Sequence, residues 1–238
     1  MPKVSVIVVS YNSENTIDKT LQSVVNQTCK DFELILVDRN SKDKTLEIAG
    51  KYKTDINKWI SEPDRLPYDT LNKGILLSQG EYLLFLNAGD IFYSPKSLET
   101  IIDKLDESDI IYFNLSINGK KYAPKYNKKY ALVEGETFLS CEFIKREFLE
   151  ATGGFDTRFR ILADKEFNLR AILKENASIK YVNEIITSVT KNNMEIMSPK
   201  KARRFSKEKS ALRKIFFTKW QNLLNRFLYC FLGKKMIT

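Results

Sequence analysis

The segment Gly80–Asp90 most strongly limits what this chain can fold into. It starts with a nearly continuous apolar run, Tyr82–Leu86, and ends in Asn87-Ala88-Gly89-Asp90. An apolar run without alternation indicates a strand buried on both faces, as in the parallel sheet of an α/β protein. Ligands of open α/β sheets bind beside the carboxyl ends of the strands, so we expect Asn87 and Asp90 at the mouth of a cleft. The alternative is an ordinary turn after a strand.

Further apolar runs of strand length alternate with segments whose apolar residues recur every three or four positions. The expected strands are Lys3–Val9, Glu33–Val37, Asn57–Ile60 and Asp109–Phe113, and the helical patterns lie at 14–27, 41–53, 68–78 and 95–105. This alternation predicts an α/β fold with a Rossmann-like, mostly parallel sheet flanked by helices.

The pattern changes after Asn114. Asn118-Gly119 is typical of a hairpin turn. Beyond it, the expected elements are a short helix at 142–150, an amphipathic helix at 162–175, and short strands at 179–182 and 185–190.

Positive charge is concentrated at the C-terminal end of the chain. From Lys200 onward there are 12 Lys or Arg and one acid, whereas the preceding residues carry 27 bases and 29 acids. A nearly neutral body argues against a surface built for nucleic acid. Residues 212–232 have the pattern of an amphipathic helix, interrupted too often by polar residues to span a membrane. We expect a basic helical tail at 193–238 that contacts a membrane surface; docking on its own domain or on a partner subunit is the alternative.

Residue content narrows the chemistry. The chain has no histidine, which excludes Ser-His-Asp and Cys-His catalysis and histidine-ligated metals. Proton transfer and metal binding must therefore rely mainly on carboxylates. The three cysteines have neither disulfide nor metal-site spacing, and a strand pattern begins almost at once. These features predict a cytoplasmic protein without a signal peptide.

Polar side chains follow three of the predicted strands. They are Ser10 and Tyr11 after the first, Asp38 after the second, and Asn87 with Asp90 after the Tyr82–Leu86 run. An aromatic ring and two carboxylates at one sheet edge suit a nucleoside diphosphate with a divalent cation, Mg²⁺ or Mn²⁺. The glycine-rich signatures of dinucleotide and P-loop sites are missing from the sequence.

Several segments in this order and spacing resemble the inverting GT-A glycosyltransferases of family two. The likeness covers about residues 3–190, and one part of it is similar to a subgroup of bacterial polysaccharide-building members. The segments are Val4–Asn12, Ser23–Thr28, Phe32–Asp38 with Ser41 and Asp43, Ser61–Ile75, Gly80–Asp90 and Gly153–Phe167.

The resemblance implies a catalytic domain at 1–192, with a donor-binding half at about 1–114 and an acceptor-side half at about 115–192. It implies a nucleotide-sugar donor, most often a UDP-sugar, and a glycan or polyprenyl-linked acceptor in cell-surface polysaccharide synthesis. The basic tail would then keep the enzyme at the inner face of the cytoplasmic membrane. Oligomerisation is compatible with this arrangement.

The resemblance also assigns roles to residues. Asp164 matches the aspartate of the family's catalytic base, and Asp90 is the remaining acid of its metal motif, for Mn²⁺ or Mg²⁺. The residues expected to bind the donor are Ser10, Tyr11, Asp38, Asp64, Asn72 and Asn87. The plainer alternatives are packing for Tyr11, a turn for Asp38 and a helix-start acid for Asp164.

The sequence departs from the family's pattern in several places. Arg39 stands where an Asp or Gly is usual, Asn87 and Gly89 replace acids of the metal motif, and Ala163 precedes Asp164 in place of Glu. Glu166 is therefore an alternative base. These departures favour, as a second hypothesis, a catalytically degenerate scaffold that binds nucleotide sugar. A nucleotidyltransferase is weaker, since the first turn lacks Gly and Lys.

Overall fold

The computed structural model describes residues 1–66, 68–124, 137–190 and 198–217. Within them, a nine-stranded mixed sheet has the strand order β3-β2-β1-β4-β8-β6-β9-β5, and β7 pairs with β6. The strands are β1 Val4–Ser10, β2 Phe32–Asp38, β3 Lys58–Ser61, β4 Tyr82–Asn87, β5 Ile91–Phe92, β6 Ile110–Ile117, β7 Lys120–Tyr122, β8 Glu142–Lys145 and β9 Ile179–Val189. The α-helices are α1 Ile17–Val25, α2 Thr45–Ala49, α3 Asp69–Leu77, α4 Ser97–Ile102, α6 Arg146–Ala151, α7 Ala163–Leu173 and α8 Pro199–Phe216.

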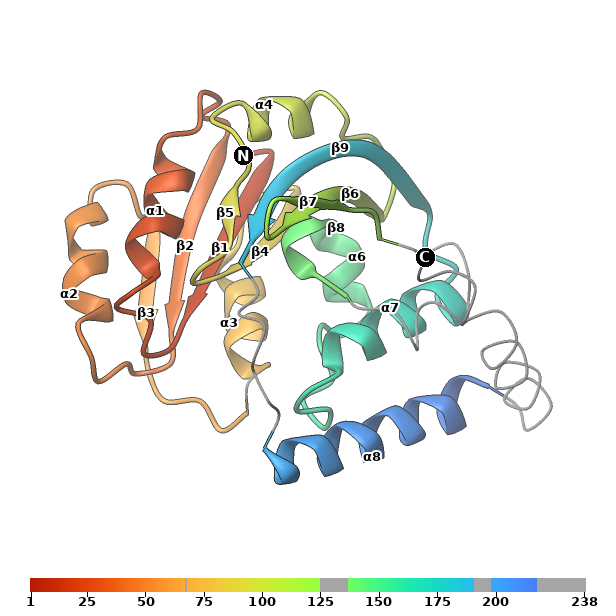
Figure 1. The fold of residues 1–238 in the computed structure, drawn as a ribbon. Coiled ribbons are helices and arrows are strands. Elements are labelled where there is room, and N and C mark those ends of the chain that lie inside the picture. The colour runs from red at the N-terminus through yellow and green to blue at the C-terminus, as the bar shows by residue number, and fades with distance from the viewer. Residues whose placement is uncertain (67, 125–136, 191–197, 218–238) are drawn as a thin grey trace.

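The first four strands along the chain form the parallel part that the sequence predicted. Strand β1 lies between β2 and β4, and β2 pairs with β3, all in parallel. The side chains of β1, β2 and β4 are mostly buried on both faces because α1, α2 and α4 cover one face and α3, α6 and α7 cover the other (Figure 1). The α/β architecture expected from the sequence, a sheet with helices on both faces, is therefore confirmed.

The second half of the sheet is mixed, and here the helix predicted at 142–150 is confirmed only from residue 146 onward. Strand β8 occupies Glu142–Lys145 and pairs antiparallel with both β4 and β6, and α6 begins only at Arg146. Phe143 and Ile144 pack into the cores on opposite faces of the sheet. Residues 142–145 become a strand because they can pair with both β4 and β6, although their local sequence pattern resembles that of a helix.

Two other predictions in this half have different outcomes. The hairpin turn is confirmed: Asn118 and Gly119 have φ of 49° and 81° between β6 and β7. The two short strands at 179–182 and 185–190 are instead one long strand, β9, which pairs parallel with β6 and has register shifts opposite Tyr112 and Asn114. These irregularities interrupt the alternation that would have revealed a single strand.

Helix α7 is not amphipathic, contrary to the prediction for 162–175. Five consecutive residues, from Lys165 to Leu169, are buried, because the helix lies between the sheet and α8 (Figure 1). Its polar side chains must therefore find partners inside the protein.

The helix predicted at 212–232 is confirmed only for residues 212–216, which form the end of a helix that begins earlier in the chain. Helix α8 starts at Pro199 and ends at Phe216, and Phe217 is extended with φ −133° and ψ 135°. Leu212 and Phe217 are buried in the core with α7, so this end of the helix docks on the chain's own fold. Residues 218–232 lie outside the described residues. Among the described residues, no helix has the length and apolar character needed to cross a membrane.

Candidate active site

A pocket of about 610 Å³ opens beside the carboxyl ends of β1 and β4. In the sheet register Ser10 pairs with Asp38, and Val9 pairs with Asn87, so the three strand ends coincide. This is the edge at which open α/β sheets bind ligands. The residues lining this strand-end pocket include Ser10, Tyr11, Arg39, Tyr68, Asn87, Asp90, Thr137, Arg160, Asp164 and Lys201.

Asp38 is enclosed beneath the pocket. It is 1% exposed, and its carboxylate accepts hydrogen bonds from the hydroxyls of Ser10 and Ser61 at 2.7 Å and from the backbone and hydroxyl of Ser41. Ser41 therefore bonds to Asp38 and does not cap α2, which begins at Thr45. The carboxylate ties the ends of three neighbouring segments together.

Tyr11 presents its ring to the pocket. The side chain is 54% exposed, and the guanidinium carbon of Arg39 lies 5.0 Å from the ring centroid. An exposed ring with a cation over one face is a surface on which a nucleobase could stack. Among the described residues, the buried Nε of Arg39 has no hydrogen-bond partner.

Asp64 belongs to an ion cluster under the pocket. Its buried carboxylate lies 2.6 Å from the Lys73 ammonium, accepts a hydrogen bond from Thr70, and is 3.8 Å from Nε of Arg39. Burial lowers the pKa of Lys73, but hydrogen bonds to Asp64 and Glu62 outweigh it and leave the pKa raised. The cluster fixes the loop after β3 against α3.

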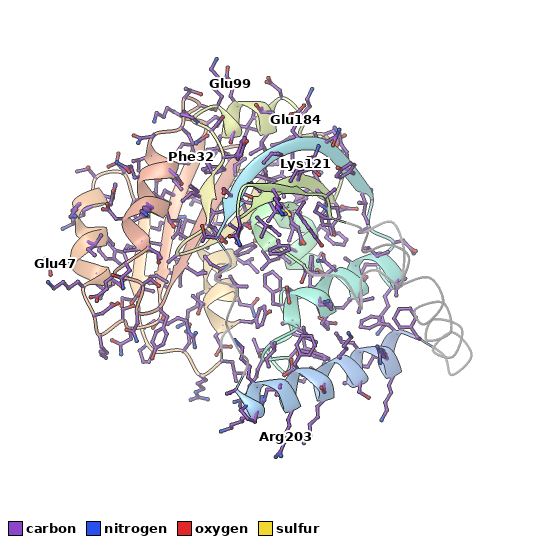
Figure 2. The ribbon with its side chains drawn as sticks, in the orientation of Figure 1. Phe32, Glu47, Glu99, Lys121, Glu184 and Arg203 are labelled. Atoms are coloured by element: carbon purple, nitrogen blue, oxygen red, sulfur yellow. The ribbon has the colours of Figure 1, made fainter. Side chains whose placement is uncertain are left out.

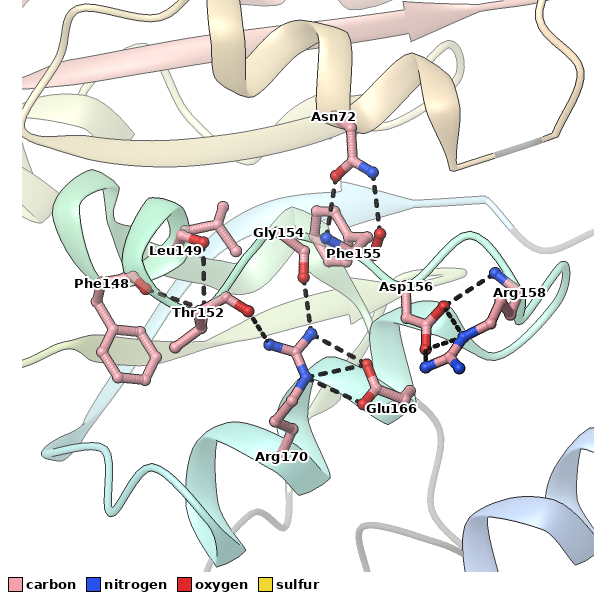
Figure 3. Close-up of polar contacts among 10 residues, drawn as sticks. All are labelled: Asn72, Phe148, Leu149, Thr152, Gly154, Phe155, Asp156, Arg158, Glu166 and Arg170. Atoms are coloured by element: carbon pink, nitrogen blue, oxygen red, sulfur yellow. Dashed lines mark hydrogen bonds and ion pairs between the residues drawn. The ribbon is translucent and has the colours of Figure 1, made fainter. Parts of the chain in front are cut away.

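Asn72 does not line the pocket. Its amide donates to the carbonyl of Phe155 at 2.9 Å and accepts from the amide of the same residue at 3.0 Å (Figure 3). A side chain at Gly154 would collide with Asn72, since a Cβ there would lie 2.8 Å from Oδ1, and φ of Gly154 is +70°. Asn72 thus anchors the loop after α6 to α3.

Glu166, the alternative base, is engaged elsewhere. Arg170 binds it through Nε at 3.0 Å and also donates to the carbonyls of Thr152 and Gly154 (Figure 3). Glu166 is 5% exposed and is not among the pocket-lining residues. Its position is that of a structural ion pair between α7 and the turn that follows α6.

Asn87 and Asp90 form a tight turn at the pocket. The backbone and side-chain amides of Asn87 donate to Oδ2 of Asp90 at 3.1 and 3.2 Å. Burial raises the pKa of Asp90 to about 6, against the opposing effect of these hydrogen bonds. Gly89, at φ +119°, allows the backbone to turn and to donate to Thr20.

The residues at this turn fit a divalent cation only as part of a larger ligand set. In the described part of the chain, no three Asp, Glu or Cys side chains are grouped as a metal site. Asp90 nevertheless offers one carboxylate to the pocket, and Mg²⁺ is commonly held by one or two carboxylates plus the phosphates of a substrate. Such a cation would share Asp90 with a diphosphate.

Asp164 lies across the pocket, in the first turn of α7. Its Oδ1 accepts a hydrogen bond from the Tyr68 hydroxyl at 2.8 Å, and its Oδ2 accepts one from the Thr137 hydroxyl. Burial, and then the Asp164 carboxylate, raise the pKa of Tyr68 well above its ordinary value, so its hydroxyl stays protonated. The carboxylate is therefore oriented by one donor on each oxygen.

The structure thus brings together only some of the predicted residues. Tyr11, Asn87, Asp90 and Asp164 line one pocket with Ser10, whereas Asp38, Asp64 and Asn72 lie behind its walls. The pocket is also lined by four residues that were not predicted as site residues: Tyr68, Thr137, Arg160 and Lys201. No local pattern marks them, because each comes from a different segment.

Comparison with known proteins gives consistent results. The model of the family "Glycosyl transferase family 2" matches residues 5–167. A "PGL/p-HBAD biosynthesis glycosyltransferase" of Mycobacterium tuberculosis is 28% identical over 195 residues, covering 79% of this chain and 76% of the relative. A "Cholesterol galactosyltransferase" of Borreliella burgdorferi is 35% identical over 190 residues, covering 73% of this chain and 50% of the relative.

Solved structures resemble the chain in fold. TarS 1–349 of S. aureus in complex with UDP-GlcNAc has a TM-score of 0.69 at 25% identity, over 83% of this chain and 61% of that one. The mannosyltransferase PcManGT of Pyrobaculum calidifontis, in complex with GDP-Man and Mn²⁺, has a TM-score of 0.63 at 18% identity, over 82% and 58%. The chain spans less than two thirds of the length of these solved proteins.

Proposed function

The chain belongs to glycosyl transferase family 2, and from this premise we propose that it transfers one sugar from a UDP-sugar to a hydroxyl of a glycan or lipid-linked acceptor, with inversion. The observation that carries the proposal is the strand-end pocket, where Tyr11, Asn87 and Asp90 face Asp164 across one cavity. A UDP-sugar is favoured because UDP-GlcNAc is the ligand of a structural neighbour, TarS.

We assign the donor to the strand-end side of the pocket. The base stacks on the exposed ring of Tyr11, and the diphosphate lies toward Asn87 and Asp90. Asp38, Asp64 and Asn72 support this site from behind by fixing the loops that form its walls, and Ser10 lines the pocket while it donates a hydrogen bond to Asp38.

A divalent cation, Mn²⁺ or Mg²⁺, would be held by Asp90 together with the diphosphate of the donor. When bound, it would offset the negative charge that develops on the departing diphosphate. Because this chain supplies a single carboxylate there, we expect the cation to bind far more tightly with the donor than alone.

In the chemical step, Asp164 acts as the general base. The acceptor hydroxyl loses its proton to this carboxylate while its oxygen forms a bond to the anomeric carbon of the donor sugar. The bond from that carbon to the diphosphate oxygen breaks on the opposite face, and its electron pair leaves with the nucleoside diphosphate. Tyr68 and Thr137 hold the carboxylate toward the pocket during this transfer.

The acceptor side favours a reaction near a membrane. The exposed basic side chains of α8 form what we call the basic face: Lys200, Lys201, Arg203, Lys207 and Lys214. Figure 2 shows Arg203 on the side of α8 that points away from the sheet. Such a face would hold the enzyme peripherally at the inner face of the cytoplasmic membrane through anionic lipids, within reach of a lipid-linked intermediate of cell-surface polysaccharide synthesis.

A donor screen tests the proposal. The purified chain is incubated with UDP-, GDP- and dTDP-sugars, with Mn²⁺ or with EDTA, and its melting temperature and the released nucleoside diphosphate are measured. We expect stabilisation by a UDP-sugar and turnover that EDTA reduces and Mn²⁺ restores. Binding without release of UDP in the presence of acceptor mixtures would favour the degenerate scaffold instead. No response to any nucleotide sugar would refute a transferase.

A further inference from the structure

Glu208 is the sole acid of α8, and it points inward. It is 8% exposed, although the helix around it carries eight Lys or Arg. Its carboxylate accepts hydrogen bonds from three consecutive backbone amides, those of Arg160 at 3.0 Å, Ile161 at 2.9 Å and Leu162 at 3.1 Å. These residues lead directly into α7, so a residue of the basic C-terminal helix fixes the entry to the helix that carries Asp164.

The peptide group of Ile161 connects Glu208 to the candidate base. Its amide donates to Glu208, and its carbonyl accepts from the Tyr68 hydroxyl at 3.0 Å. The same hydroxyl donates to Asp164 at 2.8 Å. A shift of the Ile161 peptide would therefore change how the Tyr68 proton is shared between the carbonyl and the Asp164 carboxylate.

The chemistry of this contact requires a carboxylate. Two oxygens with several lone pairs accept three N–H donors at once, and the negative charge strengthens each bond. A glutamine of the same shape would turn an amide NH₂ toward at least one backbone N–H, which leaves that donor without a partner inside the protein.

We propose that Glu208 is a positioning residue for glycosyl transfer, holding the 160–162 backbone so that Tyr68 and Asp164 meet the acceptor hydroxyl in the reactive orientation. The inference rests on the proposed function. It makes α8 a component of the acceptor side of the active site, in addition to any contact it makes with a membrane surface.

The test compares Glu208→Gln with a matched control, Ser206→Ala, at an exposed position two residues away on the same helix. Both are assayed at a temperature where circular dichroism shows each variant folded. We expect kcat of Glu208→Gln to fall at least tenfold while KM for the donor stays within twofold, because the donor side is built from other segments. Ser206→Ala should match the wild type in both. Glu208→Asp keeps the charge and should recover part of kcat.

A double-mutant cycle separates positioning from simple loss of stability. If Glu208 acts through Ile161 and Tyr68, Glu208→Gln and Tyr68→Phe should lower kcat by much less together than the product of their separate effects. Should Glu208→Gln fail to fold, Glu208→Asp in the same cycle supplies the measurement. Hydrogen exchange at the amides of 160–162 should accelerate in the Glu208 variant alone.

The outcomes distinguish this inference from the proposed function. Wild-type turnover with an unchanged kcat in Glu208→Gln would overturn the role of Glu208 and leave the transferase intact. Fully multiplicative effects in the cycle would likewise reduce Glu208 to a stabilising residue. The absence of turnover in the wild-type chain with every donor would overturn both.

Discussion

The two sides of the strand-end pocket are built in different ways. On the donor side, Ser10, Asp38 and Asn87 are neighbours because β1, β2 and β4 run parallel in one register. On the opposite side, Asp164 is oriented by Tyr68, 96 residues away in the sequence, and by Thr137, 27 residues away. The first side follows from the sheet itself, whereas the second is assembled from separate segments.

The two sides should also differ in what they contribute, one mainly to the stability of the fold and the other mainly to catalysis. Asp38 is nearly inaccessible and has its carboxylate oxygens engaged by serine groups, so its loss would disturb the fold of the sheet edge. Asp164 is only partly buried and faces the cavity. We therefore expect variants of the donor-side anchors to change the free energy of unfolding, and variants around Asp164 to change kcat.

The largest effect should come from Asp164→Asn. The amide cannot accept the acceptor's proton, so kcat should fall about 10²–10⁴-fold, the usual contribution of a general base. Donor affinity and melting temperature should stay close to those of the wild type. The measurement is UDP release together with UDP binding by calorimetry. Retained turnover would assign the base to another carboxylate and would contradict the expectation that variants around Asp164 change kcat.

Asp38→Ala should have the largest effect on stability. It removes the acceptor of several buried hydrogen bonds and leaves the hydroxyls of Ser10 and Ser61 without it, so the free energy of unfolding should fall by about 3 kcal/mol. Urea denaturation measures it. Asp103→Ala, at an exposed position after α4, is the control and should change stability by less than about 0.5 kcal/mol. Equal losses in the two variants would contradict the anchoring role.

Tyr68→Phe should separate orientation from proton transfer. Removing the hydroxyl deprives Asp164 of one donor but leaves the carboxylate in place, so kcat should fall about tenfold, or about 1.4 kcal/mol in the barrier. Tyr93→Phe, at an exposed ring, provides the control. Steady-state kinetics with the donor identified in the screen gives both values. A fall as large as that of Asp164→Asn would instead assign Tyr68 a direct catalytic role.

The smallest expected effect is on the binding of membrane vesicles by the basic face of α8. Arg203→Gln removes one charge from the basic face and should weaken binding to vesicles containing phosphatidylserine by about 1 kcal/mol, or roughly fivefold. Co-sedimentation at low and high salt measures this. Lys96→Gln, at α4 on the other face of the sheet, is the control (Figure 1). Identical binding by both variants would remove the basic face from the membrane contact.

The donor side was predictable because its signals are local. Apolar runs such as Tyr82–Leu86 indicate buried strands, and the polar residues that follow each run must lie at a common edge when the strands are parallel. That reasoning placed Tyr11, Asn87 and Asp90 at the pocket. It did not show that the carboxylates of Asp38 and Asp64 would bind to other residues inside the protein, because burial depends on which loops close over a side chain.

The acceptor side was predictable only in part. The resemblance to a known family identified Asp164, but the pattern at 142–150 indicated a helix where β8 fills a gap between two strands. The basic C-terminal segment suggested membrane contact, whereas α8 docks on α7 through Leu212 and Glu208. Whether residues beyond 217 also contact a membrane stays a prediction.

The α/β architecture, the parallel core and the edge where polar groups gather can be predicted from the sequence, because they depend on short-range periodicity. The tertiary structure determines which of those groups face the pocket and which support it. It also joined Glu208 to Ile161 across 47 positions of the chain, and Ile161 to Tyr68 across 93. Contacts between such distant segments form when helices and loops pack, and no local pattern in the chain records them.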